Sequence, residues 1–235
     1  MTDKHLSTQF DSELAGISSR VLEMGGLAES QVAQSVYALT RFSGETATQV
    51  LVQEERVNSL EVEIDRDLST IIARRQPTAR DLRLLIAISK TIGNLERVGD
   101  EAARIARTVQ RLLNTGVSSR LRLPVGDLEF EAGLAMAQLR KALDAFARLD
   151  APRAVEVLKQ DNAIDVEFDG LMRKLVTYMM EDPRTISASI DLVFVAKAIE
   201  RVGDHAKNIA EQVIYIVKGT DVRHAPLTDV ESAVG

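Results

Sequence analysis

The stretch ERVGDEAARIA (residues 96–106) recurs further along the chain as ERVGDHAKNIA (residues 200–210). Eight of the eleven positions are identical, and the second copy begins 104 residues after the first. Each copy places a glutamate and an aspartate four residues apart, and residues at this spacing lie on the same face of an α-helix. The recurrence therefore predicts an internal duplication, with one site in each half of the protein.

Apolar residues around each copy follow alternating steps of three and four, the pattern of a helix that packs along one seam. The first seam consists of Leu85, Ile88, Ile92, Leu95, Gly99, Ala102, Ala106, Val109 and Leu113. The second seam consists of Leu192, Ala196, Ile199, Gly203, Ala206, Ala210, Val213 and Val217. Each member of the second seam lies 104 residues after a member of the first, so the two helices should pack alike.

Glycine and proline positions divide the chain into six expected helices, at about residues 6–41, 45–75, 79–113, 127–149, 151–181 and 184–218. Thr78 should cap the third helix, and residues 114–126 should link the two halves. The predicted fold class is all-α, with two tandem three-helix bundles of six long antiparallel helices. The expected domains are residues 1–118 and residues 119–220, followed by a flexible tail at residues 221–235.

The composition excludes several classes of protein. Apolar residues make up 45 % of the chain and aromatic residues 4 %, and the absence of cysteine excludes disulfides and thiolate metal sites. The net charge of −6 argues against a general nucleic-acid surface. No apolar run approaches the ~18 residues of a membrane-spanning helix, and the first residues do not resemble a signal peptide. A soluble cytoplasmic protein is expected.

A second pair of carboxylates precedes each repeat, and the 104-residue offset relates these pairs as well. Each half thus offers four carboxylates, two from each of two neighbouring helices: Glu61, Asp65, Glu96 and Asp100 in the first half, and Asp165, Asp169, Glu200 and Asp204 in the second. Carboxylates about 5–6 Å apart repel one another, so each group should need a cation. Ligands made only of oxygen favour hard ions such as Mg²⁺, Ca²⁺ or Mn²⁺, and iron stays open as well.

Salt bridges to the many arginines are the alternative to metal binding; Asp100 could pair with Arg104, and Asp169 with Arg173. The repeat glycines could bring two helices close enough to share a cation, or could serve tight packing alone. His205 is expected to be a surface residue rather than a ligand. The chain contains no phosphate-binding loop and no Ser/His/Asp arrangement, which argues against ordinary catalysis.

Several motifs in order along the chain resemble the PhoU family of phosphate-uptake regulators. They are MGGLAESQV (residues 24–32), RRQPTARDLRLLIAISKTI (residues 74–92), LVTYMMEDPRTI (residues 175–186) and the two ERVGD repeats. The resemblance covers essentially the whole chain. It implies two three-helix bundles, a cytoplasmic and often dimeric protein, and metal ions or clusters held by the eight carboxylates, with Mg, Mn, Zn or Fe left open.

The resemblance also implies a function. A PhoU-type protein is expected to be a negative regulator of the phosphate regulon, not an enzyme. It would link PstB, the ATPase subunit of the Pst phosphate transporter, to the sensor kinase PhoR, and would restrain uptake when phosphate is plentiful. Contact with the membrane would come only through these partners. Two alternatives remain: a carboxylate-bridged metalloenzyme on a helical bundle, and a helical chaperone or scaffold without metal.

Overall fold

The computed structural model describes residues 2–77, 79–116 and 124–235. The helices are α1 (Thr2–Arg41), α2 (Gly44–Arg75), α3 (Ala79–Asn114), α4 (Val125–Arg148), α5 (Ala151–Glu181), the 3₁₀ helix η2 (Pro183–Thr185), α6 (Ile186–Lys218) and α7 (Leu227–Val234). No strand occurs in these ranges, so the predicted all-α class and its six long helices are confirmed. None of the described helices combines the length and the apolar character needed to cross a membrane.

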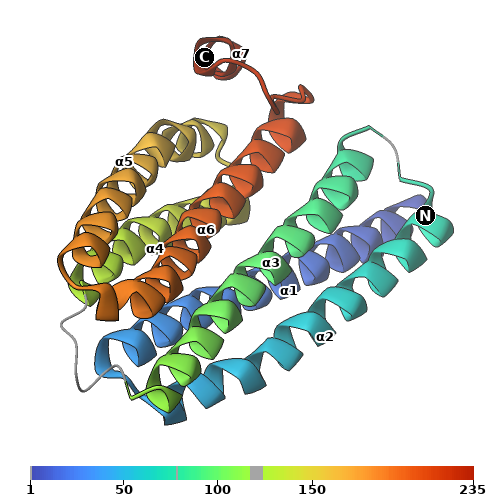
Figure 1. The fold of residues 1–235 in the computed structure, drawn as a ribbon. Helices are drawn as coiled ribbons and strands as arrows, with labels where there is room; N and C mark the ends of the chain where they lie inside the picture. Colours follow the sequence, from blue (N-terminus) through green and yellow to red (C-terminus); the bar gives the residue numbers. More distant parts are fainter. Residues whose placement is uncertain (1, 78, 117–123) are drawn as a thin grey trace.

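The six long helices form two bundles that lie side by side (Figure 1). Helices α1, α2 and α3 pack together in the first bundle, and α4, α5 and α6 pack together in the second. Helices α3 and α6 lie next to each other at the centre of the molecule, and α1 also contacts α4. The helices that carry the repeats are therefore the ones that join the two bundles.

The predicted seams are buried within their bundles. All members of both seams are buried except Leu113 and Val217, near the ends of α3 and α6, which are half-buried. Each helix also carries a second buried row at seven-residue spacing: Val98, Ile105 and Leu112 on α3, and Val202, Ile209 and Ile216 on α6. The α3 row shares a stripe with Glu101, which contacts α6. Packing along two seams explains why α3 and α6 are buried on more than one side.

The helix boundaries follow local capping chemistry. The Asp150 side chain accepts a hydrogen bond from the backbone N–H of Arg153, as expected for an N-cap. Gly219 ends α6 with a φ of 75°, in the left-handed region that glycine adopts without strain. The expected cap at Thr78 and the expected domain boundary at residues 118–119 lie outside the described residues.

The expectation of a flexible tail at residues 221–235 is wrong. Helix α7 forms there and contacts α5. Val222 and Val230 are buried, and the Lys159 ammonium lies 2.5 Å from the Glu231 carboxylate. Burial of these two valines gives the tail an apolar reason to dock, which a short polar segment does not reveal in isolation.

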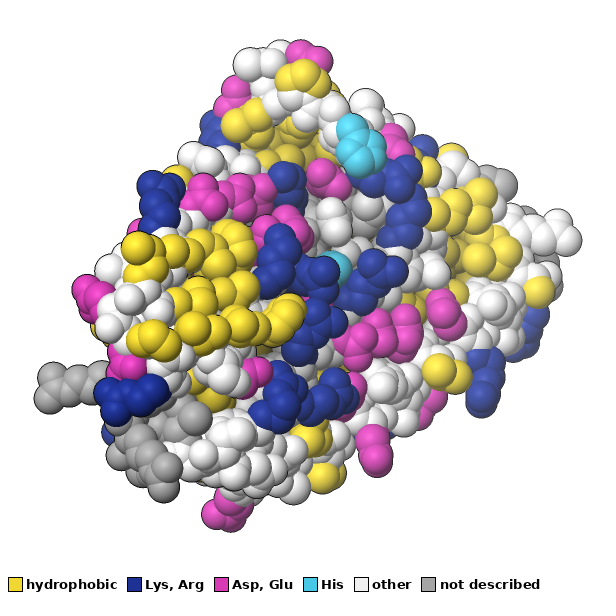
Figure 2. Space-filling view, viewed as in Figure 1, with side chains coloured by type: hydrophobic (Ala, Val, Ile, Leu, Met, Phe, Trp, Pro, Cys, Tyr) yellow, Lys and Arg dark blue, Asp and Glu magenta, His cyan; other side chains and the backbone are white. Residues whose placement is uncertain are grey.

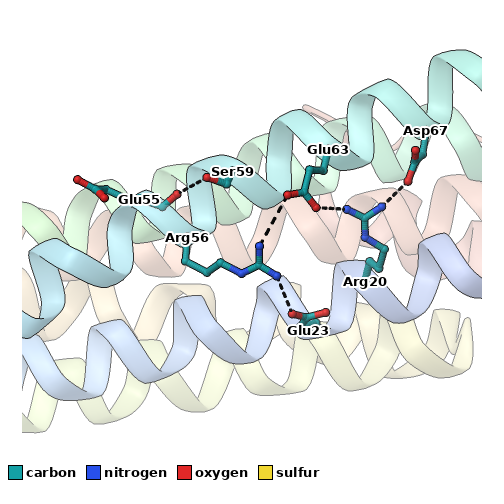
Figure 3. A network of polar contacts seen from close by, with 7 residues as sticks. All are labelled: Arg20, Glu23, Glu55, Arg56, Ser59, Glu63 and Asp67. Carbon is teal, nitrogen blue, oxygen red and sulfur yellow. Dashed lines mark hydrogen bonds and ion pairs between the residues drawn. The ribbon is translucent and has the colours of Figure 1, made fainter.

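Charged side chains also connect α1 and α2 along their exposed edge (Figure 3). Arg20 binds Glu63 and Asp67, and Arg56 lies between Glu23 and Glu63. The side chains of this network are between 28 and 53 % exposed. Exposed ion pairs contribute only about 0–1 kcal/mol each, so the buried seam, and not this network, stabilises the pairing of the two helices.

Candidate carboxylate sites and the groove between them

The first half brings its predicted carboxylates into one electrostatic group. Burial, and then the charges of Asp65 and Asp100, raise the pKa of the Glu61 carboxyl. Burial, followed by the charges of Asp100 and Glu61, likewise raises the pKa of Glu96. Glu61 from α2 and Glu96 from α3 are half-buried, whereas Asp65 is exposed and accepts a hydrogen bond from Ser89. The carboxylates thus repel one another across the α2–α3 contact, as the spacing predicts.

This first group lacks close counterions. Within the described ranges, Glu61, Glu96 and Asp100 form no ion pair. Arg104, the expected partner of Asp100, instead lies 3.4 Å from the Glu101 carboxylate. The uncompensated negative charge makes this surface attractive to a cation.

The second half gathers three of its four predicted carboxylates. Desolvation, and then the charges of Asp161 and Glu200, raise the pKa of the Asp165 carboxyl. Desolvation, followed by the charges of Glu200 and Asp161, raises the pKa of Asp204. Asp161 on α5 is therefore a member of this group that the sequence analysis missed.

Lysines partly neutralise the second group. The Lys197 ammonium lies 2.6 Å from the Glu200 carboxylate, and that of Lys207 lies 2.5 Å from Asp161. Each lysine lies on α6, within three residues of the carboxylate pair of the repeat. The two halves therefore differ in charge: the first is bare, and the second carries its own cations.

The repeat glycines serve close packing. A Cβ atom on Gly99 would lie 3.1 Å from Oε1 of the buried Gln31, and a Cβ on Gly203 would lie 3.1 Å from Oε1 of the buried Gln138. Each glutamine donates through Nε2 to a backbone carbonyl of the neighbouring helix, at 3.3 Å in both cases. The same device thus stands in both bundles, and its two glutamines are 107 residues apart, not 104.

This spacing corrects the predicted pairing of the second helices. The glycines of the repeats also face Val57 and Ile164, which again differ by 107 residues. At this offset Glu61 corresponds to Phe168, so Asp169 is not the counterpart of an acidic site residue. The Asp169 carboxylate is 68 % exposed, and its ion partner is Arg173, 4.0 Å away on the same helix. The structure therefore does not bring Asp169 to the other three carboxylates.

The sequence does contain a signal for the correct offset. GLAESQ (residues 26–31) and GLAMAQ (residues 133–138) share four of six positions at a spacing of 107. At this offset Asp161 corresponds to Glu54, whose charge contributes to the raised pKa of Glu96. The connection between α5 and α6 is three residues shorter than that between α2 and α3, which restores the offset of 104 in the last helix of each bundle.

The described side chains do not form a ready-made metal centre. Across residues 2–77, 79–116 and 124–235, no three Asp, Glu or His side chains are gathered so that they could hold one ion. The donor types and the unbalanced charge of the first half suit a hard cation, but the present orientation of the side chains does not. The predicted metal site and its identity stay predictions.

A groove of about 880 Å³ separates the two carboxylate groups. Its walls include Arg97, Asp100 and Glu101 from α3 and Arg201, Asp204 and His205 from α6. Residues 223–226, which lead into α7, also line it. Figure 2 shows Lys and Arg side chains gathered at the centre of this face, over the region where α3 and α6 meet.

His205 is not the surface residue that the sequence suggested. Its side chain is half-buried, and Nδ1 lies 3.0 Å from Oδ1 of Asn94 on α3. Burial, and then the charges of Arg97 and Arg201, lower the pKa of His205 to about 4. The imidazole is therefore neutral at physiological pH.

The sequence analysis also missed Glu131, a buried carboxyl group on α4. This residue is 1 % exposed, and neither carboxylate oxygen has a hydrogen-bond partner among the described residues. Burial, and then the charges of Glu200 and Glu167, raise its pKa to about 8. The side chain is therefore largely protonated at neutral pH.

Comparison with known proteins places this architecture in a family. The model of the PhoU domain matches twice, at residues 21–109 and at residues 131–213. The two matches fall on the two bundles.

Full-length relatives and solved structures agree with this match. A Burkholderia protein described as a "phosphate-specific transport system accessory protein PhoU homolog" is 48 % identical, and the alignment covers 95 % of each chain. The PhoU protein of Escherichia coli K12 is 42 % identical over 94 % of this chain and 90 % of its own. The crystal structure of PhoU from Pseudomonas aeruginosa superposes with a TM-score of 0.85 at 43 % identity, covering 90 % of this chain and 100 % of that one.

Proposed function

The chain belongs to the PhoU family, and on that basis we propose that it is an accessory protein of phosphate-specific transport. It acts as a negative regulator that restrains phosphate uptake and the phosphate regulon when phosphate is plentiful. The observation that supports this most strongly is the match of the family model to both halves of the chain, together with 48 % identity over 95 % of a relative named for that role.

The finer proposal is that the protein works as an adaptor. It contacts the transporter ATPase PstB and the sensor kinase PhoR, and it is a homodimer. The relatives are named as accessory proteins, which favours an adaptor over the metalloenzyme alternative. A cytoplasmic location follows from the same proposal.

Deletion of the gene tests the regulatory role. We expect phosphate-starvation genes to become constitutively active in phosphate-rich medium, as measured with a transcriptional reporter, and the intact gene supplied in trans to restore repression. Continued repression in the deletion strain would contradict the proposal. A two-hybrid assay against PstB and PhoR, with each partner tested separately, distinguishes loss of regulation from loss of one contact.

We also propose that the first-half carboxylates bind a divalent or multinuclear metal. Glu61, Glu96 and Asp100 would supply oxygen ligands, and their mutual repulsion, reflected in the raised pKa values of Glu61 and Glu96, supports attraction of a cation. A bound metal would hold α2 and α3 in register. The second group, Asp165, Glu200 and Asp204, should bind more weakly, because Lys197 already neutralises part of its charge.

Elemental analysis of the purified protein tests this second proposal. We expect Asp100→Asn to lower the metal content per chain more than Asp204→Asn does. Asp169→Asn is the matched control, because this exposed carboxylate lies apart from the group, and its metal content should equal that of the wild type. Equal metal content in all four proteins would remove the metal proposal and leave the regulatory role standing.

A further inference from the structure

Helices α3 and α6 cross in a pseudo-symmetric way, and the symmetry is broken at one pair of residues. The Arg201 guanidinium on α6 lies 3.1 Å from the buried Glu101 carboxylate on α3. Since the repeats are 104 residues apart, Arg201 corresponds to Arg97, and Glu101 corresponds to His205. The symmetric counterpart of this ion pair is thus Arg97 beside His205. A histidine is never negatively charged, so Arg97 lacks the carboxylate that its counterpart has.

Arg97 differs in this respect from the other basic residues around the groove. Arg201 is paired with Glu101, the Lys207 ammonium with Asp161 and the Arg223 guanidinium with Asp221. Arg97 forms neither an ion pair nor a hydrogen bond with any other residue in the described ranges. It nevertheless lines the groove of about 880 Å³ and a neighbouring cavity of about 350 Å³.

The surroundings of Arg97 are rich in hydrogen-bonding groups. Asn208 lies on the lining of both cavities, and its Nδ2 donates to Oδ1 of Asn94 at 3.1 Å. The acidic residues Asp100 and Asp204 line the larger cavity as well. They oppose a ligand that is negatively charged throughout, but they can accept hydrogen bonds from hydroxyl or amino groups.

We propose that the groove between α3 and α6 binds a phosphate group at Arg97. The guanidinium fork matches the oxygens of a phosphate and favours it over a point-like anion. The groove is within the size range of small-molecule pockets, roughly 300–1,000 Å³, so it has room for a phosphate monoester whose remainder donates hydrogen bonds to the carboxylates. The phosphate could also be free inorganic phosphate, which the experiment distinguishes.

Isothermal titration calorimetry on the full chain tests the proposal, with EDTA present so that metal binding does not contribute. The probes are inorganic phosphate, AMP and, as the control without phosphate, adenosine. We expect saturable binding of AMP and none of adenosine. Binding of inorganic phosphate as tight as that of AMP would identify the free ion as the ligand, and weaker binding would favour the ester.

Three variants assign the binding to Arg97. Arg97→Ala should weaken it by about tenfold or more, the usual effect of losing a charged hydrogen bond. His205→Glu restores the missing carboxylate and should also weaken it, whereas Arg66→Ala, an exposed arginine on α2, should bind as the wild type does. Circular dichroism checks that each variant is folded.

Glu101→Gln is a variant of opposite sign. It releases Arg201 from its ion pair, so we expect phosphate or AMP to bind more tightly than to the wild type. The proposal is overturned if neither probe binds the wild-type protein, or if folded Arg97→Ala binds with unchanged affinity. Because binding is measured on the isolated protein, this outcome is separate from the fate of the regulatory proposal.

Discussion

Glu131 occupies the position in the second bundle that Met24 occupies in the first, 107 residues earlier, where the methionine is fully buried. A buried carboxyl group without a hydrogen-bond partner destabilises the folded state. An acid whose pKa rises on folding keeps its proton in the folded state over a pH range in which the unfolded chain has lost it. The free energy of unfolding should therefore fall as the pH rises from 4.5, the ordinary glutamate value, to about 8.

Glu131→Leu should increase the free energy of unfolding by about 1–3 kcal/mol at alkaline pH, because it removes the unsatisfied group. It should also flatten the pH dependence between about pH 5 and about pH 9. Urea unfolding with EDTA present measures both effects. Glu129→Leu, at an exposed position on the same helix, is the control and should keep the wild-type slope. A wild-type pH dependence in Glu131→Leu would show that the carboxyl is not the titrating group.

At the scale of the element, the glycine pair in α1 shows how one helix meets two environments. A Cβ atom on Gly25 would lie 2.6 Å from Cδ2 and 3.0 Å from Cδ1 of Leu143 on α4. A Cβ on the adjacent Gly26 would meet nothing within 4 Å. The first glycine thus permits the close approach of α1 to α4 between bundles, whereas the second only weakens the helix.

Alanine substitutions should separate these two roles. Gly26→Ala should stabilise the protein by about 0.5–1 kcal/mol, the difference in helix propensity. Gly25→Ala should destabilise it, because the Leu143 side chain must move, and overpacking a core costs about 1–3 kcal/mol. Thermal unfolding followed by circular dichroism measures both. Equal effects of the two substitutions would contradict the assignment of Gly25 to the interface between the bundles.

At the scale of the whole molecule, α3 and α6 belong to both bundles at once. Each buries one row of residues in its own bundle and another, including Val98, Ile105, Val202 and Ile209, that is buried as well. The ion pair between Arg201 and Glu101 joins the same two helices. An isolated half would expose this apolar surface to water, which is unfavourable by roughly 25 cal/mol for each Å².

We therefore expect the two bundles to unfold as one cooperative unit. In hydrogen exchange measured by mass spectrometry, the amides at the centres of α3 and α6 should share the highest protection and lose it at the same urea concentration. Ile105→Asp, which places a charge between the bundles, should lower the protection of both helices. Earlier loss of protection in one bundle of the wild-type protein would contradict this coupling.

Much of this protein can be predicted from local pattern. The three-and-four spacing from Leu85 to Val109 identifies the third helix and its buried face, and the repeat at residues 200–210 identifies its twin. Seven of the eight predicted site residues lie in the two carboxylate groups. These predictions succeed because helix period and side-chain direction depend on residues close in sequence.

What the amino-acid sequence determined by itself is the helical class, the duplication and the carboxylates of each repeat, since these depend on spacing along one helix. Only the tertiary structure decided the register between helices, which replaces Asp169 by Asp161, and the lysines that neutralise the second half. It also decided that Arg97 faces His205 across the groove. The physical reason is that contacts between helices depend on loop lengths and on packing of whole helix faces, so a three-residue difference in one connection changes which side chains meet.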